Sequence, residues 1–500
     1  MKNRWYHLWC SQRFLPETHE EPESHTPISE DLEENLSRLQ NLFRGSSDVV
    51  IHRFDAAGTK AALIYVDGLI SRDLIDRDAV RPMMSGDVSL PPQRRMNVAE
   101  YKSVKTLEEF IQSFLAPNTG LLIEGHSEGY SIESKGFDRR GISEPSGEEV
   151  LRGPREGFVE NIRNNTAMLR RKLKTPELVI ESMVIGRKSK TYLAIAYLRS
   201  VVNRDVLDKI KDRIERIDID GVFETGYIEQ LTEESAWSPF ASYFVTEKPD
   251  VVAGKLLEGR IAVLCDGSPH VITAPHLFIE NLQVSEDYYN RTLHTAMLRI
   301  IRIVSLLMTV ILPGLYVSLA TFNSEMIPTV LLLGMIEERT HVPLPLGLEM
   351  LVMLFLFEVI KESGLRLPKP IGSAISIVGG LIVGQTAVSA GFVSTPTVIV
   401  VALTAVTAFT VPSLSESILF FRLIFLIAGS FFGVIGILCA MICTYAYMAN
   451  IKRFGIPFLT RVIPIYQGEQ QDRFFRMPLR KLRVRPRDIV KENVTRQKDE

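Results

Sequence analysis

Cysteine is scarce in this sequence, which has four in 500 residues. No two of them have the spacing of a metal site, and no regular spacing suggests a disulfide framework. Neither a Walker loop nor a metalloprotease motif occurs. We therefore expect a non-enzymatic protein without a cofactor or a bound metal, whose polar part folds in a reducing compartment. The four are Cys10, Cys265, Cys439 and Cys443.

A long apolar run is missing from the N-terminus, so we expect no secretory signal peptide there. Charge is missing from another part of the chain, because residues 297–450 are mostly apolar. The formal net charge of −2 hides this division. Residues 1–296 are polar and the tail is basic, so both are expected on the cytoplasmic side of a membrane.

These differences predict an α/β cytoplasmic N-terminal region followed by an α-helical, polytopic membrane domain. The N-terminal region divides into two α/β subdomains at a break near residues 140–155. The expected divisions are a disordered N-terminus with a lead helix (1–44), the subdomains (45–150 and 151–296), the transmembrane domain (297–450) and a basic tail (451–500).

One motif in the polar part is typical of hydrolases. Gly125-His-Ser-Glu-Gly129 matches the G-x-S-x-G nucleophile elbow, which needs a strand, a sharp turn and then a helix. The residues that follow, "YSIES", alternate like a strand instead. The pattern therefore predicts a hairpin turn around Ser127. Two further hairpins are predicted near Gly186 and at Asp266-Gly-Ser-Pro269.

A basic cluster around residues 152–172 raises the possibility of nucleic-acid binding. Aromatic residues for base stacking do not alternate with these basic residues, and Glu156 and Glu160 lie among them. We therefore expect no nucleic-acid partner, and interpret the cluster as a solvated face or an intersubunit salt-bridge surface. Its members are Arg152, Arg155, Arg163, Arg170, Arg171 and Lys172.

The apolar part contains about five to six segments with the character of membrane helices. Residues 298–322 are the clearest span, whereas 326–336 are too short and are expected to be re-entrant or interfacial. Residues 417–450 are too long for one straight span. Two cytoplasmic ends require an even number of membrane crossings, but five long apolar segments are present. Either 417–450 therefore folds back near Gly429–Gly433, or one other element does not span the membrane.

Residues 371–391 are rich in small side chains, which allow membrane helices to pack backbone to backbone. The glycines expected at such contacts are Gly372, Gly379, Gly380 and Gly384.

The segment "GLEMLVMLFLFEVIKESG", residues 347–364, places carboxylates inside an apolar helix. A charge at bilayer depth costs at least about 2.5 kcal/mol, so this helix must be sheltered by protein or water. Glu349 and Glu358 are nine positions apart and face opposite sides of a straight helix. Glu362 shares the face of Glu358. Glu349 lies in the first turn, where the helix dipole favours an acid, and is interpreted as a capping or intersubunit residue.

Several long motifs resemble the A subunit of GerA-type nutrient germinant receptors of endospore-forming bacteria. They include "RGPREGFVENIRNNTAMLRRKL", "EKPDVVAGKLLEGRIAVLCDG" and "RLPKPIGSAISIVGGLIVGQTAVSAGFVSTPTVIVV". The resemblance runs from about residue 45 to 465. It implies an inner spore membrane protein that acts with a permease-like B subunit and a lipoprotein C subunit. It also implies a homo-oligomer, expected to be a pentamer, around an ion pore.

The leading hypothesis is therefore a ligand-gated, cation-conducting subunit, because rings of carboxylates select cations. The candidate ion-path residues are Glu358, Glu362, Glu337 and Glu338. The structural interpretation of Glu358 is an ion pair with Lys361 or with a basic residue of a neighbouring helix. A non-conducting scaffold or signal-relay subunit is the second hypothesis. A transporter, with an unwound site near the glycines, is the third.

Overall fold

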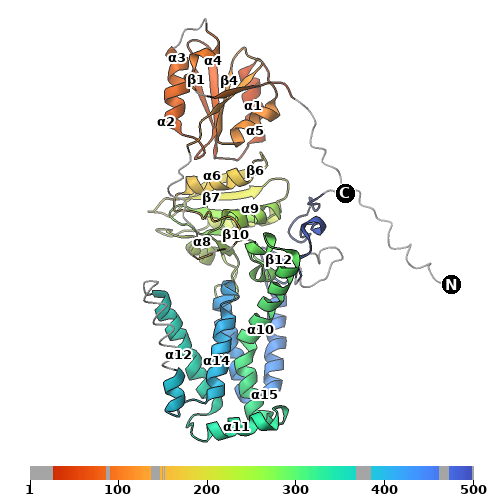
Figure 1. Cartoon of the computed structure of the whole chain (residues 1–500). Helices are drawn as coiled ribbons and strands as arrows, with labels where there is room; N and C mark the ends of the chain where they lie inside the picture. The colour runs from red at the N-terminus through yellow and green to blue at the C-terminus, as the bar shows by residue number, and fades with distance from the viewer. Residues whose placement is uncertain are drawn as a thin grey trace, which may run out of the picture. The chain divides into compact units, whose positions relative to one another are not determined.

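The computed structural model describes residues 26–85, 90–98, 100–136, 147–148, 150, 152–366, 384–460, 472–473, 475–491 and 493–497. These residues belong to two compact units, labelled by element in Figure 1. The α/β unit consists of Met1–Thr232, Phe244–Ala274 and Leu482–Glu500. The helical unit consists of Glu233–Tyr243 and Pro275–Lys481.

The α/β unit contains two five-stranded sheets whose strands all pair antiparallel. The first, in spatial order, consists of β1 (Val49–Asp55), β2 (Lys60–Val66), β4 (Asn118–Ile123), β5 (Gly129–Glu133) and β3 (Tyr101–Val104). The second consists of β6 (Leu178–Ile185), β7 (Thr191–Leu198), β9 (Ile261–Cys265), β10 (Val271–Ala274) and β8 (Phe244–Thr246).

Amphipathic helices cover these sheets. In α5, for example, Phe110, Phe114 and Leu115 are fully buried, and Thr106 caps its N-terminus by accepting a hydrogen bond from Glu109 N. The helices of this unit are α1 (Leu32–Leu42), α2 (Arg72–Ile75), α3 (Arg81–Ser85), α4 (Pro92–Arg95), α5 (Leu107–Leu115), α6 (Ile162–Lys172), α7 (Arg204–Glu215), α8 (Thr225–Thr232) and α9 (Pro249–Leu257).

The three predicted hairpins are confirmed as β4–β5, β6–β7 and β9–β10. Ser127 lies in the turn between β4 and β5, and a strand follows it where a hydrolase elbow needs a helix. This geometry gives Ser127 no role as a nucleophile.

The two sheets are copies of one module. Numbered along the chain, both have the strand order 1-2-4-5-3, and each is preceded by a helix, α1 or α6. The hydrogen bonds at that helix also repeat. Glu124 in the β4–β5 turn accepts from Leu32 N, and Asp266 in the β9–β10 turn accepts from Ile162 N.

Two further contacts match between the modules. Gly125 N donates to Glu30 O, and Gly267 N donates to Glu160 O. Both glycines have a positive φ, which glycine adopts without strain. Finally, Asn35 and Asn165 are buried, and each bonds both N and O of the residue six positions before it. The sequence prediction of two subdomains did not include this duplication.

A buried ion pair joins the two modules. Arg170 is fully buried, and its Nε and Nη2 donate to the two carboxylate oxygens of Asp48 at 2.8 and 2.9 Å. Its remaining donors bind Thr175 O and Ser46 Oγ. The prediction that Arg170 belongs to a solvated face is therefore wrong. Its position on α6 faces the first sheet, which only the tertiary structure reveals.

We expect Arg170→Leu to destabilise the α/β unit by about 3–5 kcal/mol, because Asp48 would remain buried without a cation. Arg163→Leu is the matched control on α6, since Arg163 is exposed and lies 3.7 Å from Asp67. The control should change stability by less than about 1 kcal/mol. Thermal unfolding of the full chain measures both changes, and equal losses would contradict the assignment.

The helical unit is built from α10 (Thr292–Phe322), α11 (Thr329–Arg339), α12 (Leu346–Arg366), α14 (Thr395–Ala408) and α15 (Ser415–Asn450). Among the described residues, two helical segments are long and apolar enough to cross a membrane. They are α10 and residues Pro412–Asn450, which include α15. The short segment 326–336 forms α11, drawn in Figure 1 across the end of α10, α12 and α15.

The helix α15 folds back on itself at Gly433. This residue has φ 64° and ψ −152°, outside the helical region. The rings of Phe421 and Tyr447 both contact Phe240, with centroids 5.3 and 6.5 Å away. In a straight helix these two residues would lie about 39 Å apart. The chain therefore forms two antiparallel arms, as one of the two sequence alternatives predicted.

The fold-back brings both ends of the helical segment together. Phe278 N, before α10, donates to Phe458 O, after α15, at 3.1 Å. The segment therefore enters and leaves at the same end of the helical unit.

Among the described residues, α10 and the first arm of α15 approach each other very closely. A Cβ added to Gly314 would lie 2.4 Å from Phe425 O, and one added to Gly429 would lie 2.5 Å from Gly314 O. The two backbones therefore touch directly, as small residues allow in membrane helices.

We expect Gly314→Ala to separate α10 from α15 and to destabilise the helical unit by about 1–3 kcal/mol or more, because backbone atoms must move. Gly334→Ala is the control, since a Cβ at Gly334 would meet nothing within 4 Å. Membrane accumulation and thermal unfolding in detergent measure the difference. Equal behaviour of the two variants would contradict the close contact.

Candidate ion-path site in the helical unit

A charged cluster around the Glu358 carboxylate connects three helices. Its Oε1 accepts from Arg422 Nη1 of α15 at 3.0 Å, and its Oε2 accepts from Lys361 Nζ of the same helix, α12, at 3.3 Å. Arg422 Nε donates to Thr309 O of α10 at 3.3 Å. One acid and two bases are thus gathered inside an otherwise apolar bundle.

The members of this cluster differ in exposure. The Arg422 side chain is 4% exposed, whereas those of Glu358 and Lys361 are 24% and 30% exposed. The arginine is thus enclosed, while the carboxylate remains partly open on the surface of α12. A charge at this position is costly in a membrane unless it is paired, and Arg422 supplies that pair.

Glu349 occupies a second polar site at the other end of α12. It is fully buried, and its Oε1 accepts from Ser394 N at 2.7 Å and from Ser394 Oγ at 2.8 Å. Ser394 is the N-cap residue of α14. Glu338 of α11 accepts from Thr395 N at 2.9 Å. Two carboxylates therefore bind the N-terminus of α14, where the helix dipole and free N–H groups favour negative charge.

The remaining predicted residues are dispersed. Glu362 pairs with Arg366 on the exposed end of α12 at 2.6 Å. Glu337 is exposed on α11, and its backbone carbonyl accepts from the Thr340 hydroxyl. Gly384 is buried, and a Cβ there would lie 3.5 Å from Val398. Gly372, Gly379 and Gly380 lie outside the described residues.

The intersubunit candidates are on the α/β unit. Arg163 lies beside Asp67, and Arg155 is exposed.

A buried charged cluster lies at the start of α10. Arg299 is 1% exposed, and it donates to Asp287 at 2.9 Å and to Asp472 of the tail at 2.6 Å. Arg302 donates to the same Asp287 at 2.9 Å. These two arginines therefore attach the tail and the segment before α10 to the helix.

The α/β unit has its own polar cluster around His270. Its Nε2 lies 3.3 Å from Glu247 Oε1, and its Nδ1 lies 3.6 Å from Glu224 Oε1. Burial raises the pKa of Glu224, but hydrogen bonds from Thr225, Gly226 and Ser268 outweigh it, and the net pKa is lowered. Burial, together with nearby acids, raises the pKa of Cys265 to about 12. Its thiol is therefore protonated at neutral pH and is a poor nucleophile.

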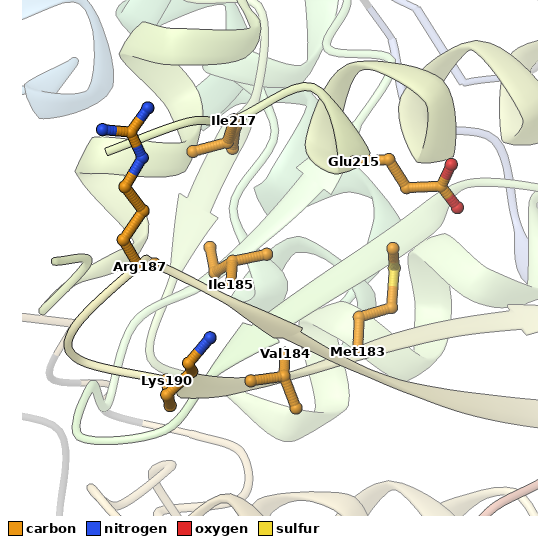
Figure 2. Close-up of a pocket in the computed structure, with 8 residues that line it drawn as sticks. Met183, Val184, Ile185, Arg187, Lys190, Glu215 and Ile217 are labelled. Carbon is orange, nitrogen blue, oxygen red and sulfur yellow. The ribbon is translucent and has the colours of Figure 1, made fainter. Parts of the chain in front are cut away.

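A shallow pocket of about 420 Å³ lies at the β6–β7 turn (Figure 2). Met183 and Ile185 come from β6, and Ile217 follows the end of α7. Arg187 at its edge is paired through two nitrogens with Asp218. Since this pair neutralises Arg187, and both Lys190 and Glu215 also line the pocket, we assign no anion site to it.

Sequence reasoning missed Arg422, Thr309 and Ser394. Arg422 had a recognisable signal, because it is the single charge between Ser417 and Asn450. A lone basic residue in such a run must find an acid. Thr309 and Ser394 had no such signal, since their roles depend on which helices touch.

The sequence from residue 37 to residue 488 matches the family described as Bacillus/Clostridium GerA spore germination protein. The chain belongs to this family. The match spans both the α/β unit and the helical unit, so it covers every residue of the sites described above.

Several relatives are similar over nearly the whole chain. An uncharacterized membrane protein of Bacillus subtilis, YfkQ, is 38% identical, and the aligned region covers 92% of this chain and 91% of YfkQ. Spore germination protein KA of Bacillus subtilis is 35% identical, and the aligned region covers 96% of this chain and 90% of that protein. Spore germination protein GerLA of Bacillus cereus is 34% identical, and the aligned region covers 94% of this chain and 99% of that protein.

A solved structure is also similar. It is the N-terminal domain of the A subunit of the Bacillus megaterium spore germinant receptor GerK3, with 31% identity and a TM-score of 0.40. The similarity covers 51% of this chain and 99% of that chain.

We expect Asp287→Asn to destabilise the helical unit of this GerA-family chain by about 3–5 kcal/mol, because Arg299 and Arg302 lose a shared buried anion. Glu337→Gln, on exposed α11, should change stability by less than about 0.5 kcal/mol. Thermal unfolding measures the loss, and protease accessibility near Asp472 reports release of the tail. An undisturbed tail in the first variant would contradict this cluster's role.

Proposed function

We propose that this chain is the A subunit of a nutrient-sensing germination receptor in the inner spore membrane. In this proposal it assembles as a homo-oligomer, expected to be a pentamer, and forms a ligand-gated cation channel whose opening triggers germination. Membership of the GerA family and the membrane-length helices support the proposal. A permease-like B subunit and a lipoprotein C subunit are the proposed partners.

The observation that carries the channel proposal is the unequal exposure of the Glu358–Arg422 pair. The arginine is enclosed, but the carboxylate is 24% exposed on α12. Rotation about an oligomer axis would repeat that carboxylate as a ring, which attracts and selects cations. We propose that Arg422 neutralises Glu358 in the resting state and that opening weakens the pair.

The surface around Glu358 is suitable for assembly. Phe355 and Val359 on α12 are 64% and 46% exposed, so this face needs lipid or another subunit against it. The shared end at which the helical segment enters and leaves supports an even number of crossings. It also supports the placement of both termini on the cytoplasmic side, the spore core.

We expect Arg422→Gln to increase cation leak without nutrient about tenfold, because losing a pair worth ~1.4 kcal/mol shifts a closed–open equilibrium by that factor. Glu358→Gln breaks the same pair but also removes the proposed carboxylate ring, so it should lower the cation conductance of each open channel. Arg366→Gln is the matched control, since Arg366 pairs with Glu362 on the exposed end of α12. Ion flux into liposomes that contain the full receptor measures all three.

A non-conducting scaffold remains the second candidate, because Glu358 is balanced by both Arg422 and Lys361. It predicts that single variants of the pair lose assembly and that the exchange Glu358→Arg with Arg422→Glu restores it. Assembled receptors that stay electrically silent with partners and nutrient present would overturn the channel proposal in favour of this one.

A further inference from the structure

One carboxylate oxygen in the helical unit has no partner among the described residues. Glu349 is 0% exposed, and both hydrogen bonds from Ser394 go to its Oε1, while its Oε2 is buried without a hydrogen bond. A buried ionised oxygen without a partner is costly, so such a group needs an explanation.

Neutral oxygen atoms surround this carboxylate. Ser394 Oγ lies 2.8 Å from Glu349 Oε1 and 3.0 Å from Thr397 Oγ1. The Tyr316 side chain of α10 lies beside Ser394 and Thr397 and within electrostatic range of Glu349. Its buried hydroxyl interacts with Ser394 and Thr397 as a hydrogen-bond partner, but no hydrogen bond of good geometry holds it in the described part of the chain. The unsatisfied Glu349 Oε2 of α12 and the loosely held Tyr316 hydroxyl of α10 thus belong to one polar cluster.

The surroundings of these oxygens are apolar. Leu346, Met350 and Val393 belong to a buried apolar cluster against which Tyr316 packs. In such surroundings an electrostatic interaction is stronger than in water, so an ion bound there would be held firmly.

The charges nearby do not neutralise Glu349. Arg339 lies within electrostatic range of Tyr316, and its Nε is buried without a hydrogen bond, but among the described side chains it forms no ion pair with Glu349. Glu338, exposed beside Thr395, adds negative charge at the outer edge of the cluster. The local balance therefore favours a cation.

We propose that a monovalent metal cation binds here, with Glu349 Oε2 as its charged ligand and the hydroxyls of Tyr316 and Thr397 as neutral ligands. Hard cations prefer oxygen ligands, and one carboxylate with neutral hydroxyls matches a single positive charge. The site joins α10, α12 and α14, so occupancy stabilises their packing. It is separate from the Glu358 pair and does not require that the protein conduct ions.

The test is the thermal stability of the detergent-solubilised full chain. Its Tm is measured in sodium, potassium and lithium chloride against N-methyl-D-glucamine chloride at constant ionic strength and pH. A cation that binds the folded state raises Tm in a saturable way. We expect at least one alkali cation to do so, and Glu349→Gln to abolish the response.

Two further variants control this experiment. Glu362→Gln removes an exposed acid from the same helix and should keep the response. Tyr316→Phe removes one neutral ligand and should raise the half-saturating concentration about five- to tenfold. Because Tyr316→Phe preserves the shape of the side chain, it tests the site even where Glu349→Gln fails to fold.

Three results would overturn the proposal. The first is a wild-type Tm that does not distinguish alkali cations from N-methyl-D-glucamine. The second is a full response in Glu349→Gln or an unchanged half-saturation in Tyr316→Phe. The third is a Tm that depends on pH alone, which would mean that Glu349 holds a proton. None of these results depends on ion flux, so they are independent of the channel proposal.

Discussion

The direct backbone contact between Gly314 and Gly429 sets the geometry of the helical unit. It holds α10 and the first arm of α15 closer than any side chain would allow. At this separation Arg422 of α15 reaches both Thr309 O of α10 and Glu358 of α12. A wider crossing would leave a buried guanidinium without these acceptors. The glycines therefore stabilise a charged cluster to which they contribute no charge.

Much of the fold could be predicted from local patterns. Alternating residues and turn chemistry identified the hairpins, and the apolar run identified α10. The excessive length of 417–450 led to the alternative of a reversal, which the structure places at Gly433. The duplicated module was not predicted, because its signature is a set of backbone hydrogen bonds made by different residue types, such as Glu124 and Asp266.

The candidate site could be predicted only in part. Helical periodicity separated Glu349 from Glu358, and both lie inside the unit with distinct partners. Periodicity describes one helix, however, and the partners come from others. Arg422 and Ser394 are 64 and 45 positions away from their acids, so no local pattern relates them. The same limit applies to Arg170, whose partner Asp48 lies 122 positions earlier.

The reversal at Gly433 determines how α15 could enter a bilayer if, as proposed, the helical unit spans a membrane. Each arm of α15 has about 17 or 18 residues, or about 27 Å of helix, close to the thickness of a hydrocarbon core of about 30 Å. Phe431 and Phe432 at the tip are exposed and aromatic, and the turn between the arms contains no charged residue. A hairpin of this kind has no polar loop to carry across the membrane. Its two arms could therefore insert into the membrane together, from one side, as a helical hairpin.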